Sequence, residues 1–279
     1  MDQYQVLGNP IKHSKSPAIH KAFADETAQD MEYSAQLVAE DDFEAYVQDF
    51  FSTGGKAGSK DKGKGLNITV PFKQRAFALA KHPSAAASLA EAANTLWCNA
   101  EGELCADNTD GVGMVRDITA NLAGSLAGKR VLVLGAGGAV RGVLEPVLAQ
   151  NPSQLVIANR TVSKAQDLAA AVQHLGNVAA CGFTEVSGQF DWIINGTSAS
   201  LSGDLPPLPA GILAVGARTY DMMYGAKPTV FSQWAVQQGA VQADDGLGML
   251  VEQAAEAFTI WRGVRPQTQQ LLADLRAQL

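Results

Sequence analysis

A lysine at an unusual place in a helix is the first residue of this chain that could do chemistry. Lys73 closely follows Pro71, and proline suits the first turn of a helix because its missing amide hydrogen is not needed there. A cation in that turn faces the positive end of the helix dipole, whereas a lysine that only adds stability is more often found at the other end. Lys73 is therefore a candidate general acid or base, and an exposed lysine without a role is the alternative.

Two serines and a polar turn supply further hydrogen-bonding groups. Ser14 and Ser16 precede Pro17, which is expected to open a helix through about Ala28. Ser16 fits the N-cap of that helix, but capping does not explain Ser14, so two hydroxyls are expected close together at the helix N-terminus. The turn at 108–111, Asn-Thr-Asp-Gly, is structurally a capped turn into the next helix.

A glycine-rich turn lies between an apolar run and a helical pattern. Residues 131–134 are four consecutive apolar residues, the pattern of a central parallel strand buried on both faces. Gly135, Gly137 and Gly138 follow, and a helix is expected over 139–150. This order of strand, turn and helix N-terminus predicts a pyrophosphate-binding turn, and a tight turn in some other α/β sheet is the alternative.

One position departs from the usual dinucleotide-binding pattern, because Val140 replaces its third glycine. We expect this side chain to press against the sheet and hold the helix slightly further out.

The end of the next predicted strand indicates which nucleotide binds. NAD-specific domains place an acid there, which accepts hydrogen bonds from the ribose hydroxyls. This chain has the neutral Asn159 followed by Arg160, whose guanidinium can bind a phosphate with two hydrogen bonds. Thr161 adds a hydroxyl and Lys164 a second cation. The pattern favours NADP, and a solvated surface arginine is the alternative.

The elements that must position these residues alternate along the chain. In the first half we expect strands at 4–7, 33–38 and 66–70, helices at 41–51 and 85–93, and a hairpin of 96–99 with 103–106. After a linking helix at 111–123, further strands are expected at 155–158, 178–182, 191–195, 213–216 and 241–243, and helices at 229–238, 247–262 and 267–279. This rhythm predicts a doubly wound parallel sheet in the second half. The glycine- and lysine-rich segment 54–65 is expected to be a mobile surface loop, with a phosphate-binding patch as the alternative.

Composition limits the class of protein. At 279 residues, with 47% hydrophobic and 18% charged residues, the chain has room for two globular domains. A net charge of −7 argues against non-specific nucleic-acid binding. Three cysteines without a Cys-x-x-Cys pair suit a reducing compartment, and four scattered histidines predict no metal site. Without a signal peptide or a spanning apolar run, we expect a soluble cytoplasmic protein that does not bind membranes.

Eight motifs in order make the chain similar to the shikimate dehydrogenase family, nearly from end to end. They are HSKSP at 13–17, NITVPFK at 67–73, NT at 94–95, NTDG at 108–111, GAGGA at 135–139, NRT at 159–161, YDMMY at 220–224 and GLGMLVEQAAEAF at 246–258. The resemblance implies an enzyme that reduces 3-dehydroshikimate to shikimate with NADPH, in aromatic amino-acid biosynthesis.

The resemblance also implies roles for individual residues. Lys73 matches the family's catalytic lysine, with Asp110 as its partner. The implied substrate-binding residues are Ser14, Ser16, Asn67, Thr69, Asn94, Tyr224 and Gln253. The implied NADP-binding residues are Gly135, Ala136, Gly137, Gly138, Ala139, Asn159, Arg160, Thr161, Lys164, Met222 and Gly246.

The implied fold class is α/β with two domains. Residues 1–110 form an α/β substrate-binding domain, completed by helices within 247–279 because Gln253 belongs to the substrate set, and 111–246 form a Rossmann-type NADP-binding domain. Two departures stand out: segment 56–64 looks like an insertion, and Ala85 replaces an acidic residue credited with a cofactor contact in many members.

Two other functions compete with this one. The first is a quinate/shikimate dehydrogenase that uses NAD. The second is an inactive nucleotide-binding sensor, which would have no need to retain both Lys73 and Asp110. The expected partner is a small-molecule substrate, and both a monomer and a homodimer remain open.

Overall fold

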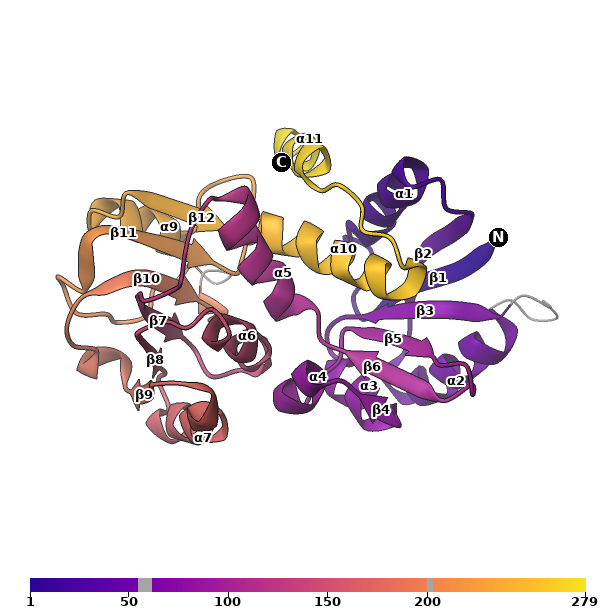
Figure 1. Ribbon diagram of the computed structural model, residues 1–279, viewed down its shortest axis with the longest axis horizontal. Helices are drawn as coiled ribbons and strands as arrows, with labels where there is room; N and C mark the ends of the chain where they lie inside the picture. Colours follow the sequence, from indigo (N-terminus) through magenta and orange to yellow (C-terminus); the bar gives the residue numbers. More distant parts are fainter. Residues whose placement is uncertain (55–61, 200–202) are drawn as a thin grey trace. The chain divides into compact units, whose positions relative to one another are not determined.

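The structure is a computed structural model that describes residues 1–54, 62–199 and 203–279 (Figure 1). The chain divides into two compact units. The first unit comprises Met1–Gly113 and Val251–Leu271, and the second comprises Met114–Leu250 and Leu272–Leu279.

The first unit is built on a mixed six-stranded sheet in the order β2-β1-β3-β5-β6-β4. Its strands are β1 (Asp2–Gly8), β2 (Met31–Leu37), β3 (Gly63–Ile68), β4 (His82–Pro83), β5 (Thr95–Cys98) and β6 (Leu104–Asp107). Strand β1 runs parallel to both β2 and β3, whereas β5 is antiparallel to β3 and β6. The predicted hairpin of β5 and β6 is confirmed, and the two-residue β4 was not predicted.

Four helices of the first unit pack on its strands: α1 (Ser16–Glu26), α2 (Phe43–Thr53), α3 (Lys73–Leu79) and α4 (Ala85–Ala90). Helix α2 buries three apolar side chains, Phe43, Val47 and Phe50. Phe43 stacks on Phe72 with ring centroids 4.5 Å apart. The two rings share one buried cluster with Leu7 of β1 and with Leu66 and Ile68 of β3.

Strand β3 begins at Gly63, inside the segment that was predicted to be a loop. The glycines there make room for aromatic rings. A Cβ at Gly63 would lie 2.1 Å from the ring of Phe50, and one at Gly65 would lie 2.5 Å from the ring of Trp261. The prediction is therefore wrong for 63–65, while most of the segment, 55–61, lies outside the described residues.

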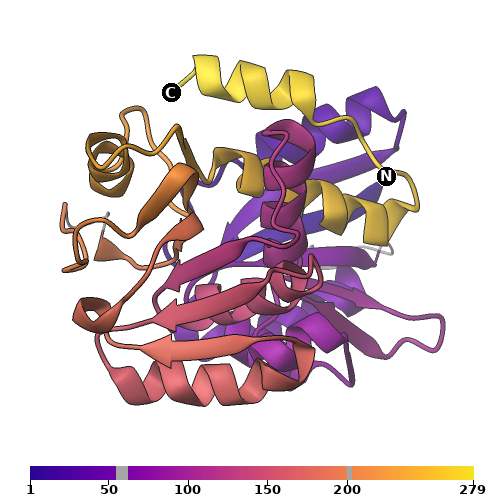
Figure 2. The ribbon, with the colours of Figure 1, turned by 60° about the vertical axis from the view of Figure 1, so that its left-hand side comes forward.

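The second unit contains a six-stranded sheet whose paired strands are all parallel, in the order β12-β11-β10-β7-β8-β9. The strands are β7 (Arg130–Leu134), β8 (Gln154–Ala158), β9 (Val178–Cys181), β10 (Phe190–Asn195), β11 (Leu213–Asp221) and β12 (Gln242–Asp245). The helices α6 (Gly138–Leu148), α7 (Val162–Val172) and α9 (Val230–Gln237) lie between successive strands. Helix α7 packs against β8 and β9 (Figure 2, salmon). The predicted doubly wound parallel sheet is confirmed.

Strand β11 extends beyond its predicted end at Gly216. Gly216 has φ +80°, and pairing with β10 resumes at Arg218 after a shift in register. The glycine therefore marks an irregularity within the strand rather than its end.

Further α-helices of the described residues are α5 (Asp110–Arg116), α10 (Leu247–Arg262) and α11 (Gln269–Ala277). Helix α5 continues as a π-helical segment, Asp117–Asn121. The C-terminal helices were expected to return to the first domain, but Leu272–Leu279 belong to the second unit. The guanidinium of Arg276 pairs there with Asp245, with 2.7 Å between Nη1 and Oδ2.

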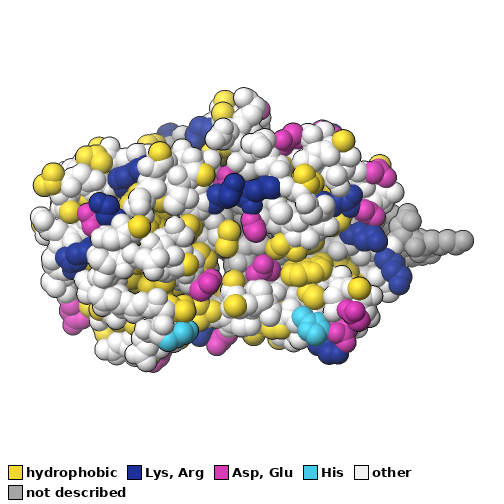
Figure 3. Space-filling model, viewed as in Figure 1, with side chains coloured by type: hydrophobic (Ala, Val, Ile, Leu, Met, Phe, Trp, Pro, Cys, Tyr) yellow, Lys and Arg dark blue, Asp and Glu magenta, His cyan; other side chains and the backbone are white. Residues whose placement is uncertain are grey.

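No helix among the described residues is both long and apolar enough to cross a membrane. In the same part of the chain, no three His, Cys, Asp or Glu side chains group as metal ligands would. On the face shown in Figure 3, lysines and arginines are interspersed with acidic side chains.

Candidate active site

An ion pair joins the two predicted catalytic residues. Lys73 is the first residue of α3 and Asp110 the first of α5, and the lysine Nζ lies 2.5 Å from the Asp110 Oδ2. The side chains are 30% and 14% exposed, so the pair is accessible from solvent. The N-terminus of α5 favours the carboxylate, and the carboxylate in turn offsets the unfavourable position of the lysine at the N-terminus of α3.

The buried amide of Asn94 connects this pair to Gln253. Its Nδ2 donates to the Asp110 Oδ1 (2.8 Å) and to the Gln253 Oε1 (3.2 Å). Its Oδ1 accepts from the backbone amide of Thr109 (2.9 Å), and the Thr109 hydroxyl donates to the carbonyl of Gln253 (3.0 Å). The first unit thus brings together Lys73, Asp110, Asn94 and Gln253, although Gln253 is far from the others in sequence.

Ser14, and not Ser16, accepts a hydrogen bond at the N-terminus of α1. Ser16 is already the first residue of α1, and Lys15 occupies the N-cap position without a side-chain cap. Ser14 accepts a hydrogen bond from the backbone amide of Ser16 at 3.3 Å, so Ser14 serves the helix N-terminus. The prediction of Ser16 as N-cap is therefore wrong, because the chain enters helical geometry one residue earlier.

Asn67 and Thr69 lie at the end of β3. Thr69 is half-buried, and its backbone amide donates to the carbonyl of Leu7 on the neighbouring strand (2.9 Å). Asn67 is only 7% exposed, and its amide accepts a hydrogen bond from the phenol of Tyr33 (2.7 Å). Sequence analysis missed Tyr33. A polar Asn67 within an apolar strand was the available signal, because a buried amide needs partners.

In the second unit the glycine turn joins β7 to α6. Gly137 is the N-cap residue of α6, and Gly138 is its first residue. Both are exposed, and a Cβ at either position would meet no atom within 4 Å. Gly135 has φ +108°, which favours glycine. The open backbone at this helix N-terminus fits the approach of a pyrophosphate.

The structure accommodates Val140 through a glycine that follows another strand. Val140 is fully buried, and Gly196 follows β10 directly. A Cβ at Gly196 would lie 2.4 Å from the Val140 Cγ2 and 2.9 Å from the Met222 Sδ. The valine methyl group thus fills the space that the missing side chain of Gly196 leaves open.

Gly196→Ala is expected to destabilise the fold by about 1–3 kcal/mol, the usual cost of overpacking a core. Val140→Ala in the same chain should recover most of this loss. Chemical denaturation of the single and double variants measures both effects. Gly225→Ala is the control, because a Cβ there would come no closer than 3.6 Å to its neighbours. Equal losses in the Gly196 and Gly225 variants would show that the contact with Val140 is unimportant.

The other predicted cofactor residues lie at the same edge of the parallel sheet, beyond the carboxyl ends of its strands. Leu134 pairs with Ala158, so the glycine turn lies beside Asn159 and the exposed Arg160. Thr161 and Lys164 are also exposed at the start of α7. On the other side, a Cβ at Gly246 would lie 2.3 Å from the carbonyl oxygen of Met222, so these two residues are neighbours.

A buried polar group that sequence analysis missed holds the segment after β11. The Asp221 carboxylate accepts hydrogen bonds from the Asn195 amide (3.1 Å), the Thr229 hydroxyl (2.6 Å) and the backbone amide of Met223 (3.1 Å). Tyr224 follows in the same segment and is half-buried. Burial, assisted by the charge of Asp245, raises the pKa of the Tyr224 phenol.

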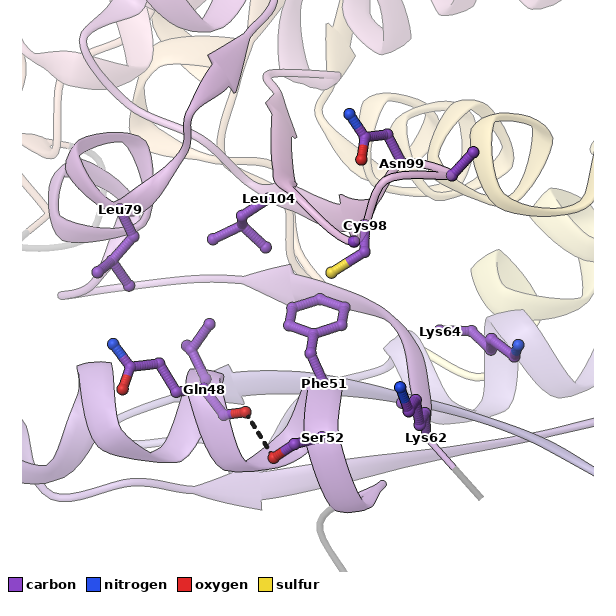
Figure 4. Close-up of a pocket in the computed structure, with 13 residues that line it drawn as sticks. Gln48, Phe51, Ser52, Lys62, Lys64, Leu79, Cys98, Asn99 and Leu104 are labelled. Carbon is purple, nitrogen blue, oxygen red and sulfur yellow. Dashed lines mark hydrogen bonds between the residues drawn. The ribbon is translucent and has the colours of Figure 1, made fainter. Parts of the chain in front are cut away.

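A separate cavity of about 660 Å³ lies at the opposite end of β3 (Figure 4). It is lined by α2, the start of β3 and the β5–β6 turn, with Phe51, Cys98 and Leu104 among the side chains. Of the described residues that line it, none belongs to the predicted site. The candidate active site is therefore the cluster around Lys73 and Asp110.

Comparison with known families covers most of the chain. The family model described as "Shikimate dehydrogenase substrate binding domain" matches residues 6–96. Models described as "Shikimate / quinate 5-dehydrogenase" and "Shikimate 5'-dehydrogenase C-terminal domain" match residues 117–202 and 246–275. A shikimate dehydrogenase (NADP(+)) of Cellvibrio japonicus is 56% identical over 279 residues, which is 100% of this chain and 98% of the relative. A protein of the same name from Marinobacter nauticus is 54% identical over 99% of this chain and 98% of its own length.

Solved structures show the same likeness. An Ael1 enzyme from Pseudomonas putida has a TM-score of 0.91 at 49% identity, covering 99% of this chain and 98% of that one. Shikimate 5-dehydrogenase from Thermus thermophilus, in complex with NADP(H) and shikimate, has a TM-score of 0.85 at 28% identity and covers 100% of both chains.

Proposed function

The chain belongs to the shikimate dehydrogenase family, and we propose that it uses Lys73 and Asp110 to reduce 3-dehydroshikimate to shikimate reversibly with NADPH. It is an NADP-dependent oxidoreductase acting on a CH–OH group. The observation that carries the assignment of these two residues is their ion pair, accessible to solvent and tied through Asn94 to Gln253.

The proposed chemistry of this pair is acid–base catalysis. Reduction of a ketone requires a hydride for the carbon and a proton for the oxygen. The Lys73 ammonium donates that proton to the developing alkoxide, and solvent can replace it because the side chain is partly exposed. Asp110 holds the ammonium in place and accepts a hydrogen bond from a substrate hydroxyl. In the reverse direction, the neutral amine of Lys73 accepts the proton from the alcohol.

Neutral donors and acceptors suit a substrate that carries several hydroxyls and one carboxylate. The proposed contacts are Ser14, Ser16, Thr69, Asn94, Gln253 and, from the second unit, Tyr224. A tyrosine phenol is protonated at neutral pH, and the raised pKa of Tyr224 does not change this, so the phenol can donate a hydrogen bond. Asn67 was expected in this set, but protein groups already engage its amide on both sides.

The second unit fits NADP. When bound, the nicotinamide supplies the hydride. The open turn at Gly135, Ala136, Gly137, Gly138 and Ala139 would hold the pyrophosphate, and Asn159, Arg160, Thr161 and Lys164 would hold the 2′-phosphate end. Met222 and Gly246 would contact the nicotinamide. Ala85, the first residue of α4, carries only a methyl group, which cannot replace the acidic contact credited to many relatives.

The proposed roles of the two parts of the chain follow from these residues. The first unit binds substrate and the second binds NADP, which agrees with the substrate-binding family model over residues 6–96. Placement of the enzyme in the cytoplasm stays a prediction, which three free cysteines support.

An absorbance assay of nicotinamide reduction tests this function by crossing shikimate and quinate with NADP⁺ and NAD⁺. We expect turnover of shikimate with NADP⁺ to exceed the other three combinations. Faster turnover of quinate with NAD⁺ would favour the alternative quinate/shikimate dehydrogenase. Ligand binding measured by tryptophan fluorescence, without turnover of any pair, would favour the sensor.

A further inference from the structure

A continuous series of hydrogen bonds leads from Tyr33 to Asp110. The Tyr33 phenol donates to the Asn67 Oδ1 (2.7 Å), and the Asn67 Nδ2 donates to the Asn94 carbonyl (3.1 Å) and the Thr95 Oγ1 (3.2 Å). The Thr95 hydroxyl donates to the Asn94 Oδ1 (3.0 Å), and the Asn94 Nδ2 donates to the Asp110 Oδ1 (2.8 Å). The series therefore ends on the carboxylate that holds Lys73.

Each link of this series has one possible direction. The carbonyl of Asn94 can only accept, so Asn67 must turn its NH₂ group towards it. The Asn67 oxygen then faces Tyr33, which must donate. Burial raises the pKa of Tyr33 well above its usual value, so the phenol keeps its proton. The same logic turns the Asn94 oxygen towards Thr95 and its NH₂ group towards Asp110.

Both hydrogens of the Asn67 amide are occupied by protein acceptors, and the side chain is 7% exposed. We infer that Asn67 is a positioning residue that acts on Asp110 through Asn94, and that Tyr33 and Thr95 fix the direction of its amide. This inference rests on the proposed function, because it assigns Asn67 to the support of the catalytic pair rather than to substrate binding.

The ring of His20 stacks on the ring of Tyr33 and restricts its movement. The His20 ring stacks on Tyr33 with centroids 4.1 Å apart and planes 6° apart, and its side chain is fully buried. Burial lowers the pKa of His20 to about 3, so the ring is neutral near pH 7. Phe23, Phe258 and Trp261 surround the same ring. The phenol therefore has little freedom to turn away from Asn67.

A double-mutant cycle between Asn67 and Asn94 tests the inference. We expect Asn67→Ala to lower kcat about tenfold in the wild-type background, and less than about twofold in the Asn94→Ala background, because the residues act in series. A direct substrate contact would instead raise KM by the same factor in both backgrounds. That additive result would overturn the inference.

Smaller changes keep the test independent of folding. Thr95→Val, which removes only the hydroxyl function, should lower kcat about tenfold, and Thr95→Ser should restore it because its hydroxyl can make the same two bonds. Tyr33→Phe should lower kcat severalfold with little change in KM. Tyr46→Phe is the matched control, since its phenol donates to Gln5 (2.8 Å), which is not part of the series.

The melting temperature of every variant separates lost activity from lost folding. Equal kcat values for wild type, Tyr33→Phe and Thr95→Val would overturn the inference while leaving the proposed function intact. A folded wild-type protein that does not turn over shikimate with NADP⁺ would instead refute the proposed function, and the inference with it.

Discussion

Lys73→Ala is expected to lower kcat by about 10²- to 10⁴-fold, the usual contribution of general acid–base catalysis. The ammonium of Lys73, held 2.5 Å from the Asp110 carboxylate, is the proposed proton donor. The KM for shikimate should change much less, because the hydroxyl and amide groups proposed to bind substrate remain. Steady-state kinetics with shikimate and NADP⁺ measure both constants.

Two further variants make this result specific. Lys81→Ala removes another lysine of the same unit, one that pairs with Glu103, and should leave kcat unchanged. Asp110→Asn should also slow turnover, because the amide can still form hydrogen bonds but cannot stabilise an ammonium. A Lys73→Ala enzyme with nearly normal kcat would remove this lysine from the mechanism.

The second large effect concerns the choice of nucleotide. Arg160→Ala is expected to weaken NADP⁺ binding by about 1.5–3 kcal/mol, the range for hydrogen bonds to charged groups. Arg160 is exposed beyond the end of β8, where a carboxylate would repel the 2′-phosphate, and its guanidinium can bind that phosphate through two hydrogen bonds. Isothermal titration with NADP⁺ measures the loss.

NAD⁺ is the internal control for this prediction, because it lacks the 2′-phosphate and its affinity should barely change. Lys129→Ala removes a cation of the same unit that lies 3.8 Å from Asp191, and it should affect neither nucleotide. If Arg160→Ala weakened the binding of NADP⁺ and NAD⁺ equally, the arginine would not bind the 2′-phosphate.

Sequence periodicity predicted most of the fold because most elements bury one regular face. Helix α10 was predicted at its observed bounds, and α2 was predicted within two residues of its own. The prediction failed where a glycine has a structural role that the local sequence does not reveal. Gly63 and Gly216 look like loop residues, yet one lies under an aromatic ring and the other interrupts β11 without ending it. Such uses depend on residues distant in sequence.

The candidate site also has residues that local motifs predicted and residues that depend on distant partners. Motifs indicated Lys73, Asp110, Asn94 and Gln253, and the structure places these side chains in one cluster. Tyr33 belongs to none of these motifs, and the buried Asn67 indicated only that some partner was needed, not that it was Tyr33. The direction of a hydrogen bond depends on which groups are neighbours in space. The spacing of residues along the chain does not reveal those neighbours.

The packing of Val140 against Gly196 has a consequence for how this chain can change over evolutionary time. The two positions share one small volume, so a larger residue at 196 is tolerated only after 140 has become smaller. With glycine at position 140 the 2.4 Å contact would be absent, and only the contact with the Met222 Sδ, at 2.9 Å, would closely oppose a side chain at position 196. The order of substitutions is thus constrained, and the two sites should covary although they lie far apart in the sequence.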